Sequence, residues 1–139
     1  MARILEFFHM SIDKRPMFLD LLSISLPVTA LVSILHRVTG ILILLSLPIL
    51  VFMFYLTMSS QEGFALWQSM YNSYAVVRFV VFGMYASISY HAIAGIRHMV
   101  HDFSHCHELS SSILSAKTTL AVWLVQALVF FYLIMWGIV

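Results

Sequence analysis

Charged side chains are scarce in this sequence. The chain of 139 residues has seven Lys and Arg and six Asp and Glu, which together make up 9% of it, whereas a soluble domain carries about 25%. Because 62% of the residues are hydrophobic, the surface of so short a chain cannot face water. A net charge of +1 also falls short of the clustered basic face that nucleic-acid binding requires. We therefore expect an integral membrane protein with no nucleic-acid partner.

Cysteines, repeats and linkers are also nearly absent. The single cysteine, Cys106, excludes an internal disulfide. No repeat, low-complexity segment or linker divides the chain, so we predict one membrane-anchor domain over residues 1–139. A cleavable signal peptide is not expected either, because the apolar stretch after Lys14 and Arg15 runs on to Leu56 without a cleavage-site pattern.

Three long runs without charge stand out in what remains. Each is about 18 to 22 residues, or about 27 to 33 Å as a helix, close to the roughly 30 Å hydrocarbon core of a bilayer. Strands of a membrane barrel would be about half this length and would alternate in polarity. The sequence therefore predicts an all-α protein whose three transmembrane helices form part of a heteromeric bundle, with a kink at Pro48. The predicted spans are approximately residues 27–56, 76–100 and 113–139.

The distribution of basic residues predicts an orientation. Residues 57–77, which we read as the loop between the first two spans, contain no Lys or Arg, and Arg78 lies at their edge. Because basic residues favour the inner side, we expect the N-terminus on the cytoplasmic or matrix side, with residues 1–20 along the inner interface. The basic residues that indicate this are Arg3, Lys14, Arg15, Arg97 and Lys117.

Two polar segments lie at span ends that this topology places on the same membrane face. They are SILHRVTG, residues 33–40, and YHAIAGIRHMVHD, residues 90–102. Within each segment the polar and small residues recur at helical spacing and form one stripe. Ionisable groups inside a membrane normally face the bundle interior and mark a ligand or ion path, so we expect the two stripes to meet. The stripes consist of Ser33, His36, Arg37 and Gly40, and of His91, Gly95, His98 and Asp102.

His91 is the deepest of these groups, about 9 Å further into the bilayer than Arg97. A neutral imidazole at that depth needs a partner, either a backbone carbonyl or hydroxyl such as that of Ser87, or a metal. A b-type haem fits the second alternative, with iron at depth and two propionates reaching a cationic rim near the surface, where His36, Arg37, Arg97 and His98 lie. His36 is the only other candidate ligand here, and it lies nearer the surface, so a second axial histidine is expected from another chain. The small residues that would admit a flat macrocycle, or a closely packed helix, are Ala92, Ala94 and Gly95.

Ser33 and Arg37 suggest a second ligand. They stand one turn apart, and a hydroxyl with a guanidinium offers donors suited to a quinone carbonyl that gains negative charge on reduction. The alternative is an arginine that reaches lipid headgroups as an interfacial anchor.

The segment HDFSHCH, residues 101–107, has the spacing of a helical zinc site at His101 and His105. No paired cysteine or glutamate motif accompanies it, so an interfacial loop is favoured. The three tryptophans, Trp67, Trp123 and Trp136, are expected to anchor the spans at the membrane interfaces.

Taken together, the two polar segments resemble a known family. The runs RPMFLDLLSISLPVTALVSILHRVTG (residues 15–40) and YHAIAGIRHMVHDF (residues 90–103) are similar to the two signature regions of the large membrane-anchor cytochrome b subunit of succinate dehydrogenase. The length, the three spans and the inside N-terminus also match, so the resemblance covers nearly the whole chain. One departure is the sequence after RP, where many members have serine and proline; this resembles the bacterial branch and leaves the candidate site unchanged.

The resemblance implies roles for particular residues and partners. His91 would be one axial ligand of haem b, with the other supplied by a second, smaller anchor subunit. Ser33 and Arg37 would line the ubiquinone site beside the iron–sulfur subunit, and His36, Arg37 and His98 would lie near the haem propionates. The chain would then anchor the iron–sulfur and flavoprotein subunits of a tricarboxylic acid cycle enzyme in the bacterial inner membrane, or in the mitochondrial inner membrane.

Two other functions stay open. One is an anchor of the fumarate reductase type, which often holds two haems or none; a single deep histidine argues against two. The other is a small transporter or channel subunit with His91 and Arg37 on a polar path, which predicts polar stripes over the full membrane depth. In all of these the chain would not oxidise succinate alone, since it has no flavin or iron–sulfur motif.

Overall fold

The computed structural model describes residues 26–103 and 108–136, and these form four helices. In chain order they are α2 (Val28–Ser59), α3 (Gln61–Ser73), α4 (Ala75–Phe103) and α5 (Leu109–Trp136). Three of them, α2, α4 and α5, are long and apolar enough to cross a membrane. The predicted all-α fold with three spans is therefore confirmed, while the inside location of residues 1–20 lies outside the described residues.

The helices change direction at short, well-defined breaks. Pro27 precedes α2 in extended conformation, and its carbonyl accepts hydrogen bonds from the first turn. Ser60, also extended, separates α2 from α3, and its hydroxyl caps α3 by accepting from the Gly63 N–H at 3.0 Å. An added Cβ at Gly63 would lie 2.5 Å from the Leu56 carbonyl oxygen. The close approach of α3 to the end of α2 therefore requires a glycine.

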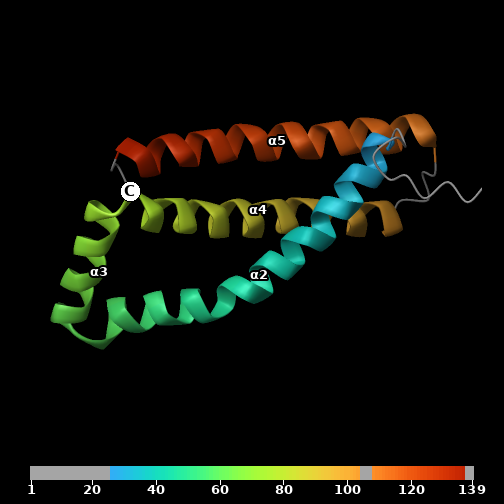
Figure 1. The fold of residues 1–139 in the computed structure, drawn as a ribbon. Helices are drawn as coiled ribbons and strands as arrows, with labels where there is room; N and C mark the ends of the chain where they lie inside the picture. The colour runs from blue at the N-terminus through green and yellow to red at the C-terminus, as the bar shows by residue number, and fades with distance from the viewer. Residues whose placement is uncertain (1–25, 104–107, 137–139) are drawn as a thin grey trace, which may run out of the picture.

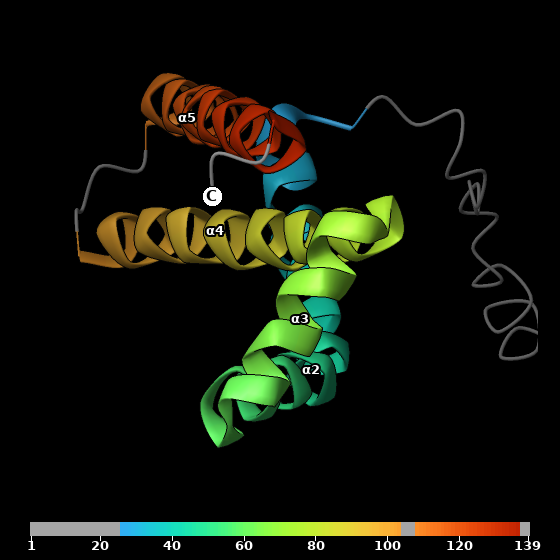
Figure 2. The ribbon, with the colours of Figure 1, turned by 90° about the vertical axis from the view of Figure 1, so that its left-hand side faces the viewer.

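α3 differs from the sequence prediction, which has a loop over residues 57–77. It is a short amphipathic helix that joins the ends of α2 and α4 and runs across them (Figure 1). Figure 2 shows the same arrangement from the side on which α3 lies.

The three long helices are arranged in two ways. α5 runs antiparallel beside α4, whereas α2 crosses α4 obliquely and changes direction partway along its length (Figures 1 and 2). Pro48 lies inside α2, and a proline there removes a backbone hydrogen bond and bends the helix. The first residues of α2 and α5 and the last of α4 meet at one end of the bundle, which we call the motif end.

The core lies in the half of the bundle nearer the motif end. Small side chains let the helices approach closely there, as is usual between membrane helices. Trp123 is part of this packing: its indole N–H donates to the Ala86 carbonyl at 3.0 Å, and its ring meets Tyr90 edge-on. Trp123 thus packs against α4, while its predicted place at a membrane interface stays a prediction. The buried cluster comprises Val32, Tyr90, Ala94 and Ala116.

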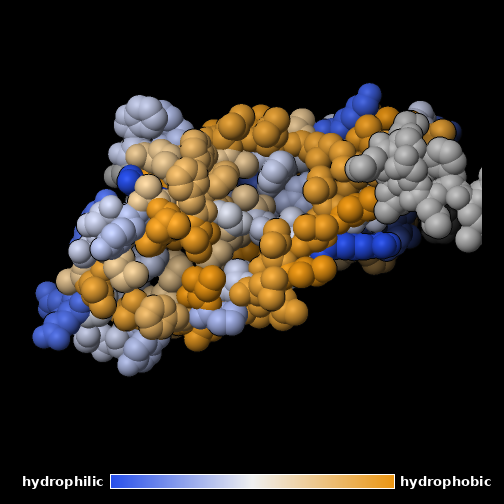
Figure 3. Space-filling view, viewed as in Figure 1, coloured by the Kyte–Doolittle hydropathy of each residue, from blue (hydrophilic) through white to orange (hydrophobic). Residues whose placement is uncertain are grey.

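The outside of the bundle is largely apolar. In Figure 3 hydrophobic residues cover the middle of the visible face, and hydrophilic residues gather toward its ends. None of the most apolar window of α2 is buried by the rest of the chain, against 17% for α4 and for α5. Such a surface suits lipid or other membrane subunits.

Candidate functional site

The two polar segments meet at the motif end of the bundle, as the sequence predicted. Residues 33–40 lie on α2 and residues 90–102 on α4, and three hydrogen bonds or close polar contacts join them. The Tyr90 hydroxyl donates to the Val32 carbonyl at 3.1 Å. The imidazole of the next residue, His91, contacts the His36 carbonyl and the Thr39 hydroxyl. These contacts bring both segments into one site.

Three histidines form the centre of this site. The rings of His36 and His91 are stacked, with centroids 4.1 Å apart and planes 17° from parallel. The His98 ring is the second neighbour of the His36 ring, and these two rings have centroids 5.2 Å apart and planes tilted by 47°. All three side chains are half-buried. Three of the five predicted site residues are therefore neighbours in space.

The hydrogen bonds of His91 fix which ring nitrogen carries the proton. Its Nδ1 lies 3.1 Å from the carbonyl oxygen of His36. A carbonyl oxygen can only accept, so Nδ1 carries a hydrogen, and in the neutral ring Nε2 then keeps its lone pair. Within residues 26–103 and 108–136, Nε2 has no hydrogen-bond partner. The carbonyl partner that sequence reasoning offered for His91 is thus present, while Ser87 donates to the Gly83 carbonyl instead.

Gly40 makes room for the His91 ring. A Cβ added at Gly40 would lie 3.1 Å from Cε1 of His91, closer than ordinary van der Waals contact. A Cβ added at Gly95 would lie 3.6 Å from Nε2 of His36, which is an ordinary contact distance. The site therefore holds the His91 ring against bare backbone, and in the neutral ring Nε2 offers one lone pair. A macrocycle whose iron takes one imidazole from this chain fits that donor set.

Ser33 and Arg37 do not join the histidine cluster. Ser33 is half-buried and Arg37 is exposed on α2. Among the described residues no hydrogen bond or ion pair to the Arg37 guanidinium occurs. Its guanidinium is therefore on the outside of the described helices, apart from the histidine cluster.

Arg97, which the sequence places in the cationic rim, forms its hydrogen bonds with α5. Its guanidinium donates to the Ser115 hydroxyl at 3.0 Å and to the Ser112 carbonyl at 3.2 Å, both on α5. His101 shares the Ser115 hydroxyl, with Nε2 at 2.8 Å. Sequence reasoning missed this polar junction between α4 and α5, although the SSS run at residues 110–112 was a signal for it.

No set of three or more His, Cys, Asp or Glu side chains is placed to hold a metal ion within the described ranges. Of the HDFSHCH segment, His105, Cys106 and His107 lie outside those ranges. His101 is engaged by α5, as described above.

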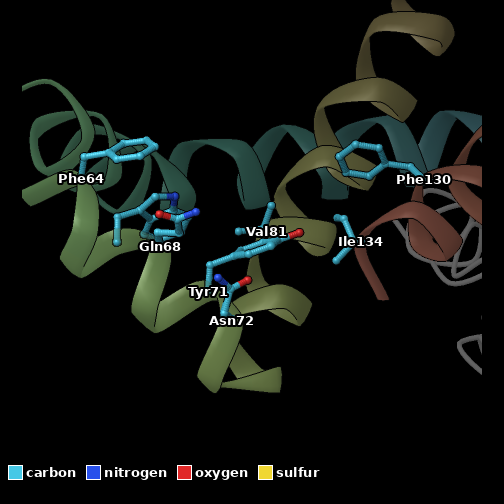
Figure 4. Close-up of a pocket in the computed structure, with 8 residues that line it drawn as sticks. Phe64, Gln68, Tyr71, Asn72, Val81, Phe130 and Ile134 are labelled. Atoms are coloured by element: carbon cyan, nitrogen blue, oxygen red, sulfur yellow. The ribbon is translucent and has the colours of Figure 1, made fainter. Parts of the chain in front are cut away.

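A separate groove lies at the opposite end of the bundle, between α3 and the ends of α4 and α5 (Figure 4). It has a volume of about 550 Å³, and its polar lining side chains are those of Trp67, Gln68, Tyr71 and Asn72. None of the predicted site residues lines it. The groove is instead formed by Phe64, Trp67, Gln68, Tyr71, Asn72, Val81, Phe130 and Ile134.

Comparison with known proteins supplies the context for this geometry. Residues 11–134 match the family described as "Succinate dehydrogenase/Fumarate reductase transmembrane subunit". The chain is also similar to the succinate dehydrogenase cytochrome b556 subunit of Coxiella burnetii (strain RSA 493 / Nine Mile phase I). The two are 28% identical over 109 residues, which cover 78% of this chain and 87% of that relative.

Proposed function

This chain belongs to the family of succinate dehydrogenase/fumarate reductase transmembrane subunits, and from that premise we propose that it is the large cytochrome b anchor of a succinate:quinone oxidoreductase. In this role it forms a single membrane-anchor domain, holds haem b together with a second anchor subunit, and helps to form the ubiquinone-reduction site. Electrons pass from the iron–sulfur subunit to quinone at this anchor.

The observation that carries the haem proposal is the hydrogen bond of His91 to the His36 carbonyl. In the neutral ring this leaves a lone pair on Nε2, which has no partner among the described residues and lies on the ring that Gly40 accommodates. Histidines that bind metals commonly donate their other ring N–H to a carbonyl in this way. His91 would hold the iron on one side, and a histidine of the second anchor subunit would hold it on the other. When bound, haem b supplies a one-electron redox centre.

His36 and His98 would serve the propionate end of the same group. The His36 ring lies between the other two, stacked on His91 and next to His98, and His98 follows His91 by two helical turns toward the motif end. Imidazole N–H groups can donate to carboxylates at the membrane edge, where they compete with water.

Ser33 and Arg37 would bind the quinone. They lie one turn apart on α2, and the exposed Arg37 has no partner among the described residues. A hydroxyl and a guanidinium can both donate to a quinone carbonyl, and their dipole and charge stabilise the negative charge that develops on its oxygen during reduction. Arg37 is also close enough in sequence to His36 to serve a propionate.

The partners follow from what the chain lacks. With one cysteine and no flavin motif, it requires an iron–sulfur subunit and a flavoprotein subunit for succinate oxidation. The basic residues favour a cytoplasmic or matrix location for the motif end, where those soluble subunits would dock. The match to a bacterial relative supports the bacterial inner membrane.

A fumarate reductase anchor is the second candidate, because the family description covers both enzymes. The single deep histidine in α4 still argues against an anchor with two haems, since each haem needs a pair of ligands. Family membership gives no support to the transporter or channel alternative.

Co-purification tests the proposed assembly. With an affinity tag on this chain, we expect soluble subunits that carry flavin and iron–sulfur centres to purify with it from detergent-solubilised membranes, in fixed ratio. A chain that purifies without flavin or iron–sulfur centres, while membranes retain succinate oxidation, would contradict the proposal.

Substitutions at Ser33 and Arg37 test the quinone site. We expect Ser33→Ala and Arg37→Ala to lower succinate–quinone activity about 10- to 1,000-fold, the usual cost of removing a donor to developing charge. Reduction of an artificial dye by the soluble subunits should stay close to wild type. Thr118→Val, which removes an exposed hydroxyl at the α5 side of the motif end, is the matched control. Wild-type succinate–quinone activity in both variants would contradict a quinone role, whereas equal losses in both assays would indicate an assembly defect.

A further inference from the structure

Two residues of the SILHRVTG segment lie against His91 but are not assigned to a ligand in the function proposed above. They are Thr39 and Gly40, which follow His36 on α2 and face His91 of α4. We propose that these two residues, with the His36 carbonyl, position the His91 imidazole so that Nε2 is the nitrogen presented to haem iron. This inference rests on the proposed haem function and adds positioning residues to it.

Two neighbours of the His91 ring determine which of its nitrogens carries a proton. The His36 carbonyl accepts from Nδ1 at 3.1 Å. The Thr39 hydroxyl donates to the Leu35 carbonyl at 2.8 Å and lies 3.0 Å from the His36 carbonyl. Because its hydrogen is used on its own helix, its oxygen can face Nδ1, 3.5 Å away, only as an acceptor. Both neighbours of Nδ1 therefore favour a hydrogen on that nitrogen, and both leave the lone pair on Nε2.

The plane of the His91 ring is restricted by His36 and by the backbone at Gly40. His91 stacks on His36 at 4.1 Å, so its ring plane is already restricted by one neighbour. A methyl group at position 40 would approach Cε1, the carbon between the two ring nitrogens, at 3.1 Å. The ring would have to turn or move away, which changes the stacking on His36 and the direction of the Nδ1 hydrogen bond. When the His91 ring turns, the direction of its Nε2 changes as well.

Glycine is otherwise an unfavourable residue at position 40. Gly40 lies in the interior of the long helix α2, where alanine is the better helix former. A glycine there carries a cost to the helix, which the space needed by the His91 ring explains. Gly83 on α4 offers the contrast: a Cβ added there meets nothing within 4 Å.

The test compares Gly40→Ala with Gly83→Ala in the complete, purified complex. The readouts are the ratio of haem to flavin, the electron paramagnetic resonance signal of the oxidised low-spin haem, and its reduction potential. For Gly40→Ala we expect haem affinity to fall about 10- to 100-fold, the range found when groups that orient a metal ligand are removed. Haem that remains bound should show a shifted low-spin signal. Gly83→Ala should match wild type in all three.

A second variant covers the case in which Gly40→Ala does not assemble, which flavin content and dye reduction report. Thr39→Val keeps the shape of the side chain and removes only the oxygen near Nδ1. We expect it to keep its flavin, and to shift the low-spin signal and the potential in the same direction as any assembled Gly40→Ala complex. Wild-type haem content, signal and potential in Gly40→Ala, or in Thr39→Val where Gly40→Ala does not assemble, would overturn the inference.

These outcomes are distinct from failure of the proposed function. If wild-type complex with flavin and iron–sulfur centres holds no b-type haem, the haem function itself is wrong. If it holds haem that depends on His91 but is indifferent to Gly40 and Thr39, only the positioning role is wrong.

Discussion

At the scale of single residues, Tyr90 connects the core to the site. Its side chain is 1% exposed, its hydroxyl bonds the Val32 carbonyl of α2, and its ring meets Trp123 of α5 edge-on at 5.3 Å. One side chain thus joins all three long helices. Since His91 is the next residue on α4, the packing of Tyr90 sets the position of the site relative to α2.

Substitution of Tyr90 separates the two contributions of this side chain. Tyr90→Phe removes one hydrogen bond and should cost about 0.5–1.5 kcal/mol of stability. Tyr90→Ala removes a buried ring and should cost about 3–5 kcal/mol. The thermal unfolding midpoint of the purified complex in one detergent measures both. Equal shifts for the two variants would show that the ring does not provide most of the stabilisation.

The sequence predicted part of the site at this scale. The helical stripes placed His36 and His91 on facing segments, because residues three and four apart share a helix face. The stacking of the two rings, and the carbonyl as the partner of His91, could not be predicted. They depend on the rotation of α2 against α4, which a pattern within one helix does not determine. The roles of Ser33, Arg37 and His98 as ligand-binding residues stay predictions.

At the scale of elements, the junction of α4 and α5 depends on one charged side chain. Arg97 donates to Ser115 and Ser112, and the exposed Lys117 of α5 forms no hydrogen bond within the described ranges. Hydrogen bonds from a charged donor contribute about 1.5–3 kcal/mol each, less where water competes. Arg97 therefore contributes to helix packing here, and its role at the haem rim stays a prediction.

Removal of the charge tests that role. We expect Arg97→Gln to lower the thermal midpoint of the complex by the equivalent of about 1–3 kcal/mol, with haem content preserved at low temperature. Lys117→Gln removes the same charge from an exposed position on the neighbouring helix and should change little. A loss of haem without a loss of stability in Arg97→Gln would instead place this guanidinium at the propionates.

Element prediction failed at α3 for a simple reason. The search for membrane spans selects long uncharged runs, and α3 is short and contains Glu62 and several amides. Its signals were local: a serine cap at Ser60, Glu62 in the first turn, and aromatic residues Phe64, Trp67 and Tyr71 at helical spacing. These signals identify an amphipathic helix of the kind that lies along a membrane surface.

At the scale of the whole molecule, the three spans were predictable because bilayer thickness fixes their length. Their crossing was not, because lipid is as apolar as the helices and gives no hydrophobic force toward one packing. Small buried residues such as Ala94 and Ala116 and the bonds of Tyr90 determine it instead. The uncovered apolar surface of α2 fits a chain that completes its packing with lipid and a second anchor subunit.

The central claim is that His91 binds the iron of haem b in an assembled oxidoreductase. Its most direct test is the reduced-minus-oxidised absorption spectrum of the purified complex carrying His91→Leu, normalised to flavin content and compared with wild type. The account predicts that the b-type haem signal is lost or shifts to that of a haem with an altered ligand, while flavin and iron–sulfur centres are retained. An unchanged b-type signal with wild-type haem content would contradict it.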